Sequence, residues 1–221
     1  MQYHVNRAAV IPELTADWSA PVWGNAETGT LTHIRPQTRD HIPQVSFRVL
    51  HDEDHIYGIF QTQDCYVRSV ETQFQAQVCK DSCVEFFFKP HHGVGYFNLE
   101  MNAGGAFLLY YVRNHKRGEN GFADFSKLSP QEGKLVQVKT NMPQVIDPEI
   151  TTPVTWCAQF TIPMTLLENY TGALKNFNGV TWHANFYKCG DHTSHPHWIT
   201  WNPISETNYH LPECFGTLML A

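Results

Sequence analysis

The chain has 221 residues, 42% of them hydrophobic, and a formal net charge of −6. A chain of this length can bury a sizeable core, and no Pro-, Gly- or Ser-rich linker divides it, so residues 1–221 are predicted to form a single domain. The negative charge argues against a nucleic-acid or anionic-membrane partner, and no segment reaches the roughly 18 consecutive apolar residues of a membrane-spanning helix.

The N-terminal segment, MQYHVNRAAVIPELTADW, lacks the basic and then apolar regions of a secretory signal. A cytoplasmic protein is therefore expected as the sequence is written, and a secreted or periplasmic one if a leader was removed. The cysteines have no CxxC spacing and are expected to be reduced, mostly buried thiols. They are Cys65, Cys79, Cys83, Cys157, Cys189 and Cys214.

Short apolar or alternating segments, separated by turn residues, recur along the chain and predict β-strands. The expected strands are 45–50, 55–62, 83–89, 96–102, 106–112, 134–139, 155–162, 180–188 and 217–221. Only PMTLLENY (163–170) has a helical pattern, with Pro163 suited to the first turn. Many short strands with one short helix predict an all-β fold, an antiparallel β-sandwich.

The segment KDSCVEFFFKP (80–90) carries two carboxylates, Asp81 and Glu85, four positions apart. Its β-branched and aromatic residues indicate a strand, on which the two carboxylates stand about 13 Å apart. That distance exceeds the about 5 to 9.5 Å of a glycosidase pair. Glu85 therefore needs a partner on another strand.

The alternation of side chains between the two faces of a strand, here called strand parity, supplies that partner. If 83–89 and 96–102 form a hairpin with their apolar faces together, one permitted register sets Phe86 opposite Leu99 and Glu85 opposite Glu100. Asn98 then shares the outward face with both acids.

Two opposed acids repel unless a cation, an arginine or a shared proton compensates. A two-residue register slip, or neutralisation by Arg68 or Arg113, is the alternative to a functional pair.

The segment CGDHTSHPHW (189–198) collects ligand types that suit zinc, but its spacing matches neither HExxH nor a finger pattern. A polar loop before a strand is the favoured interpretation.

Several segments together resemble a known family. They are DSCVEFFFKP (81–90), YFNLEMNAGG (96–105), TWCAQFTIP (155–163), WHANFYK (182–188) and the stretch from Trp198 to Gly216 with WNPI and YHLPECFG. The chain resembles the carbohydrate-binding module family 9-like domains, which are related to the cellulose- and xylan-binding modules of bacterial xylanases and to the wider DOMON-like sandwiches. The resemblance covers nearly the whole chain, in the family's order.

This resemblance implies a jelly-roll or immunoglobulin-like sandwich that binds a β-linked glucan or xylan oligosaccharide, or a related sugar, without cleaving it. The sugar is expected between two aromatic rings with polar residues at its hydroxyls. The implied ligand-binding residues are Glu85, Glu100, Asn185 and Tyr209, and parity adds Asn98. The family's other aromatic position holds Val78-Cys79 here, so Phe74 and Trp198 are the candidates for an aromatic platform.

Three further possibilities remain open. A glycoside hydrolase could use Glu85 and Glu100, because opposed carboxyls about 5 Å apart match a retaining enzyme. A haem- or metal-binding DOMON-like domain would need an axial His, Met or Lys facing a deep pocket. The family also implies structural calcium, for which the acidic turn Asp52-Glu53-Asp54 is a candidate, although it offers too few ligands alone.

Overall fold

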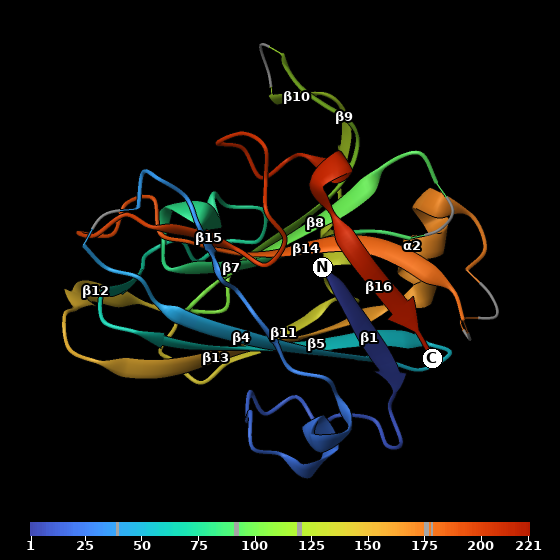
Figure 1. The fold of residues 1–221 in the computed structure, drawn as a ribbon, viewed down its shortest axis with the longest axis horizontal. Coiled ribbons are helices and arrows are strands. Elements are labelled where there is room, and N and C mark those ends of the chain that lie inside the picture. The colour runs from blue at the N-terminus through green and yellow to red at the C-terminus, as the bar shows by residue number, and fades with distance from the viewer. Residues whose placement is uncertain (39, 91–92, 119–120, 175–176, 178) are drawn as a thin grey trace.

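The computed structural model describes residues 1–221 except 39, 91–92, 119–120, 175–176 and 178. Most of the chain folds into β-strands in two stacked layers, with β7, β8 and β14 in one layer and β4, β5 and β13 in the other (Figure 1). The strands are β1 (Gln2–Arg7), β2 (Gly29–Thr30), β3 (His33–Ile34), β4 (Gln44–His51), β5 (His55–Asp64), β6 (Val67–Ser69), β7 (Cys83–Lys89), β8 (Tyr96–Asn102), β9 (Phe107–Gly118), β10 (Gly121–Lys127), β11 (Gln137–Thr140), β12 (Ile146–Ile150), β13 (Val154–Pro163), β14 (Thr181–Cys189), β15 (Trp198–Thr200) and β16 (Gly216–Leu220). The helices are α1 (Pro130–Gly133) and α2 (Met164–Thr171), and the 3-10 turns are η1 (Pro21–Asn25), η2 (Val78–Lys80) and η3 (Pro212–Cys214).

The upper layer in Figure 1 has the strand order β10-β9-β8-β7-β14-β16, and the lower layer has β4-β5-β13-β11. β1 joins them, since its first residues pair in parallel with β16 and its last two with β4. The all-β sandwich with a short helix is thus confirmed, but the sheet is mixed and not purely antiparallel. The sequence-based prediction missed β1 because QYHVNR is short and half polar.

The predicted strands form within a few residues of their expected limits, with one exception. β9 continues to Gly118, well beyond the predicted end at 112, and pairs with an unpredicted strand, β10. This outer half is largely exposed, so it lacks the apolar alternation from which a strand is read. α2 begins after Pro163, which is its N-cap residue. Residues 91 and 92, in the turn between β7 and β8, lie outside the described residues.

The main core lies between the two sheets and includes ten apolar residues from β7, β8, β13 and β14. They are Val84, Phe86, Phe88, Phe97, Leu99, Met101, Trp156, Phe160, Trp182 and Phe186. Phe86 stacks on Phe160 of the facing sheet, with ring centroids 5.5 Å apart. Trp201 is also buried here.

A second apolar cluster covers the outer face of the sheet that contains β7, β8 and β14. Phe87, Tyr187 and Leu108 lie on this face and pack against Tyr209 and Phe215 from the C-terminal segment. The outer face is therefore covered by loops and by the β9–β10 hairpin, and is not an open solvated surface. The candidate site lies within this covering.

Candidate functional site

The register of β7 and β8 brings two glutamates together on the covered outer face. Glu85 lies directly opposite Glu100, and Phe86 opposite Leu99, as predicted. The glutamates are only 3% and 7% exposed. The alternative of a two-residue register slip between these strands is therefore wrong.

The two arginines suggested as neutralising partners are engaged elsewhere. Arg68 pairs with Asp81 at 2.8 Å and Arg113 pairs with Asp124 at 2.6 Å. The buried acids therefore have neither of these cations to compensate them.

Burial instead keeps the acid pair from being fully ionised. Loss of hydration, followed by the charge of Glu100, holds the pKa of Glu85 well above its usual range. Burial raises the pKa of Glu100 to about 7. Near neutral pH the pair thus retains a proton and offers both a donor and acceptors to a ligand.

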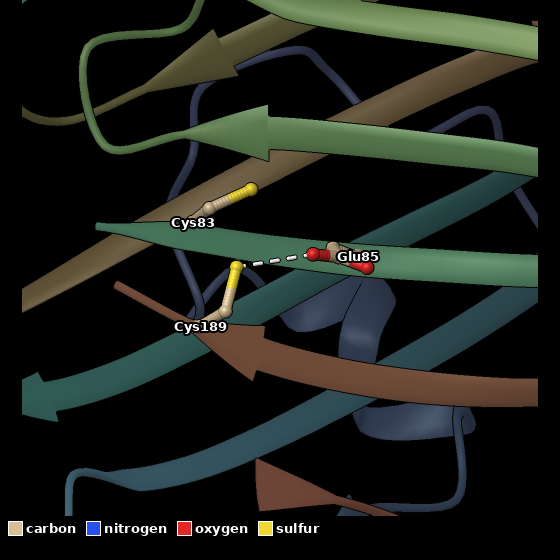
Figure 2. A group of neighbouring side chains, drawn as sticks. All are labelled: Cys83, Glu85 and Cys189. Atoms are coloured by element: carbon tan, nitrogen blue, oxygen red, sulfur yellow. Dashed lines mark hydrogen bonds between the residues drawn. The ribbon is translucent and has the colours of Figure 1, made fainter. Parts of the chain in front are cut away.

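Neighbouring side chains orient both carboxyls. Asn98 Nδ2 donates to Glu100 Oε1 at 3.1 Å, and its own Oδ1 accepts from the Tyr110 backbone N–H at 3.2 Å. The Cys189 thiol donates to Glu85 Oε1 at 3.1 Å, as Figure 2 shows. These contacts fix the floor of a pocket.

The pocket above this floor has a volume of about 600 Å³, within the range of about 300 to 1,000 Å³ that is usual for ligand sites. Its walls combine aromatic rings with charged groups of both signs. The aromatic residues are Tyr110, Phe122, Phe125, Trp198 and Tyr209, and the charged ones are Arg35, Arg117, Lys127, Asp191, Glu85 and Glu100.

Trp198 and Tyr209 form one wall with Arg35 between them. The Arg35 guanidinium carbon lies 5.1 Å from the Trp198 ring centroid and 5.6 Å from that of Tyr209. Trp198 Nε1 donates to Asp191 Oδ1 at 2.7 Å, which fixes the indole plane. A sugar needs such rings for its apolar face, and polar groups for its hydroxyls.

The family model for carbohydrate-binding family 9 matches residues 23–220, which is most of the chain. The chain belongs to carbohydrate-binding family 9. This membership confirms the predicted resemblance and the prediction of non-catalytic carbohydrate binding over a glycosidase. None of the curated proteins compared matches the chain.

Solved structures agree with the family 9 fold. A Bacteroides uniformis protein that is provisionally named carbohydrate-binding is 26% identical, with a TM-score of 0.85, and the match covers 100% of this chain and 99% of that one. A family 9 module from Caldicellulosiruptor kristjanssonii in complex with glucose is 15% identical, with a TM-score of 0.62 over 100% and 96% of the two chains. The same kind of module in complex with cellotriose is 15% identical, with a TM-score of 0.61 over 100% and 93%.

The fold brings five of the seven predicted site residues together in the pocket. Glu85, Asn98, Glu100, Trp198 and Tyr209 all line it. Tyr209 is only 8% exposed, stacks on Tyr187 with centroids 4.1 Å apart, and donates its hydroxyl to the Lys188 carbonyl at 3.1 Å. Its ring therefore also packs the outer cluster, so truncating it would disturb folding as well as the pocket.

The other two predicted residues lie outside the pocket lining. Asn185 is fully buried, and its amide bonds the Asn202 carbonyl at 3.0 Å and the Asn202 and Phe186 backbone N–H groups at 2.8 and 2.9 Å. It anchors the segment after β15. Phe74 packs on Phe107, with ring centroids 5.0 Å apart, against the inter-sheet core.

Sequence reasoning missed the residues that the β9–β10 hairpin contributes. Tyr110 could have been found, because extending the register by one strand sets it opposite Asn98. Phe122 and Phe125 could not, since strand alternation puts positions three apart on opposite faces. Register shifts in β10 between these two residues alter that alternation, and both rings line the pocket.

The position at which the resemblance implied a second aromatic residue holds Val78-Cys79. Val78 packs in the outer cluster, and Cys79 in η2 lines the pocket. The hairpin rings and Trp198 supply the aromatic surface of this pocket instead.

The two metal expectations from sequence have different outcomes. In the 189–198 loop, Asp191 binds Trp198, His195 stacks on Tyr66 and His197 contacts Lys188, so the imidazoles do not converge on one point. Residues 190–197 therefore form a polar loop before β15, as predicted.

The acidic turn 52–54 already uses its oxygens. Asp52 accepts from the Asp54 and His55 N–H groups and from the Tyr57 hydroxyl, and Glu53 pairs with Arg7. Calcium prefers six to eight oxygen ligands, so this turn does not fit the ion as folded, and structural calcium stays a prediction without an assigned site.

Among the described residues, no helix is long and apolar enough to cross a membrane.

Proposed function

We propose that the pocket on the outer face of β7 and β8 binds an oligosaccharide of β-linked glucose or xylose units, or a related sugar. The observation that carries the proposal is the buried Glu85–Glu100 pair, which retains a proton beneath a wall of aromatic rings. A proton-sharing pair and the Asn98 amide suit hydroxyl groups, which both donate and accept hydrogen bonds. The glucose and cellotriose complexes of the Caldicellulosiruptor kristjanssonii modules support this sugar class.

The pocket's open aromatic surface is where a sugar ring would stack. Trp198 is partly exposed, and its indole is held by Asp191. At the floor of the pocket, Glu85 would accept hydrogen bonds from the sugar hydroxyls or donate one to them. Both side chains can be changed with less loss of packing than Tyr209.

A glycan array on the purified protein identifies the sugar, and calorimetry with cellotriose and xylotriose measures its affinity. Trp198→Ala and Glu85→Gln are each expected to weaken binding at least about tenfold, equivalent to about 1.4 kcal/mol. Trp18→Ala is the matched control, because Trp18 is a partly exposed tryptophan that packs on the cluster around Trp23, Leu50 and Tyr57 in the other sheet.

The control should bind like the unchanged protein. If neither Trp198→Ala nor Glu85→Gln alters the affinity for a sugar that the array identifies, the pocket is not the binding site.

A further inference from the structure

Three potential metal ligands meet at the floor of the pocket. Cys83 begins β7 and Cys189 ends β14, and the antiparallel register sets these two residues directly opposite each other. Glu85 lies two residues after Cys83, so its side chain is on the same face of the strand. Figure 2 shows both sulfur atoms and a Glu85 oxygen gathered at this end of the two strands.

The donor atoms are close together and withdrawn from solvent. The two Sγ atoms and a carboxylate oxygen of Glu85 all lie within 4.8 Å of one another, and all three residues are buried. Cys189 Sγ is already 3.1 Å from Glu85 Oε1. In a tetrahedral zinc site with Zn–S bonds of about 2.3 Å, ligand atoms are about 3.5 to 4 Å apart. Small side-chain rotations would therefore bring the three donors onto one ion.

The donor set selects the kind of ion. Two thiols and one carboxyl do not suit calcium or magnesium, which prefer oxygen ligands. They suit a borderline-soft divalent ion, because thiolate, imidazole and carboxylate are the usual zinc ligands. We propose that Cys83, Glu85 and Cys189 bind a zinc-type divalent cation.

The position of the three ligands leaves one side of the ion accessible. Glu85 and Cys189 line the pocket, whereas Cys83 lies beneath it. A water molecule or a ligand hydroxyl can complete the coordination from the pocket, as in zinc sites with three protein ligands and an open fourth position. Binding displaces the two thiol protons, and the proton of Glu85 where that carboxyl is protonated, to solvent, since thiolate and carboxylate are the metal ligands.

The test uses the metal alone, without sugar, so its outcome is separate from that of the carbohydrate proposal. Metal-free, reduced protein is titrated with Zn²⁺ against a chromogenic chelator, and with Co²⁺ while thiolate-to-cobalt charge-transfer absorption is recorded. The cobalt signal reports sulfur ligation, so the 13 histidines of the chain do not produce it. One equivalent of either ion is expected to bind.

Cys83→Ser and Cys189→Ser should each lower the zinc affinity at least about 100-fold and abolish the cobalt absorption. Cys157→Ser is the control, because Cys157 is a buried cysteine in β13 of the other sheet, and it should leave both signals unchanged. Should a serine variant fail to fold, alkylation of the unchanged protein gives the same information: Zn²⁺ should protect Cys83 and Cys189 more than Cys157.

The proposal would be overturned by absence of the cobalt absorption in folded protein, by a zinc affinity in both serine variants equal to that of the unchanged protein, or by no selective protection from alkylation. The thiol–carboxyl contact would then be only an internal hydrogen bond.

Discussion

At the scale of single residues, the site depends on two acids that avoid mutual repulsion by keeping a proton. Asn98 donates a hydrogen bond to Glu100, and the Cys189 thiol donates one to Glu85. Arg68 and Arg113 pair with other acids and do not neutralise the pair. The cost of burying the two carboxyls is therefore expected to depend on pH.

Glu100→Gln tests this expectation. The pKa of Glu100 is raised from 4.5 to about 7 in the folded protein, so the folded state binds more protons than the unfolded state between these values. Stability from this group is present below about pH 4.5 and is lost as the pH rises through about 7. Relative to the unchanged protein, the variant should therefore gain on the order of 2 kcal/mol of unfolding free energy between about pH 5 and about pH 8.

Urea unfolding of both proteins at the two pH values measures the difference. Glu206→Gln, at an exposed position, should show no such gain. A constant difference between Glu100→Gln and the unchanged protein across this range would show that the pair does not hold a proton.

At the scale of elements, the β9–β10 hairpin turns the face of a sheet into a pocket. Its inner strand carries Tyr110, and the irregular register of β10 presents Phe122 and Phe125 to the same cavity. The two rings contact each other edge to face, with centroids 5.5 Å apart, and Phe122 contacts His210. The hairpin is thus a wall of the pocket, while Leu109 and Tyr111 on the other face of β9 belong to the inter-sheet core.

Phe122→Ala should therefore weaken oligosaccharide binding several-fold while lowering the unfolding free energy by about 1 kcal/mol or less, because the ring is only partly buried. Asp124→Asn is the control on the same strand; Asp124 pairs with Arg113 at an exposed site and does not line the pocket. Calorimetry and thermal melts of both variants distinguish the outcomes. A large loss of stability with unchanged affinity would make Phe122 a packing residue only.

At the scale of the whole molecule, a buried ion pair connects the two sheets. Lys188 of β14 lies 3.4 Å from Asp64 of β5, and both side chains are fully buried. His41 contacts Asp64 at 2.7 Å, and His197 contacts the Lys188 ammonium at 2.5 Å. Burial, and then the Lys188 charge, lower the pKa of His197 to about 3, so this imidazole stays neutral.

Removing one partner of such a pair leaves a buried charge without compensation. Lys188→Met should lower the unfolding free energy by about 3 kcal/mol or more, and Lys188→Met combined with Asp64→Leu should recover much of the loss. Chemical unfolding of the single and double variants measures both effects. If the double variant is less stable than Lys188→Met, the pair is not the reason for the loss.

The sequence by itself determined the strands that bury one face, because alternation and turn chemistry are local signals. The hairpin of β7 and β8 and its Glu85–Glu100 register followed from keeping Phe86 and Leu99 in one core. Glu85, Asn98 and Glu100 could be placed together on one outward face on that ground alone. The resemblance to family 9 made Glu85 and Glu100 ligand-binding candidates and added Asn185 and Tyr209. Trp198 was a candidate because Val78-Cys79 stands at the family's other aromatic position.

Only the tertiary structure decided which residues close the site. The outer half of β9 and all of β10 are polar or half-exposed, so no burial pattern marked Phe122 and Phe125 as neighbours of Glu100. Asn185 matched the family motif, but its amide forms hydrogen bonds with Asn202. This contact joins two segments of the chain, and no local sequence pattern encodes it. Cys83 and Cys189 are 106 positions apart, and they meet because antiparallel pairing of β7 and β14 sets them opposite each other. Such contacts depend on which strands become neighbours, and that is settled by burial of the whole chain.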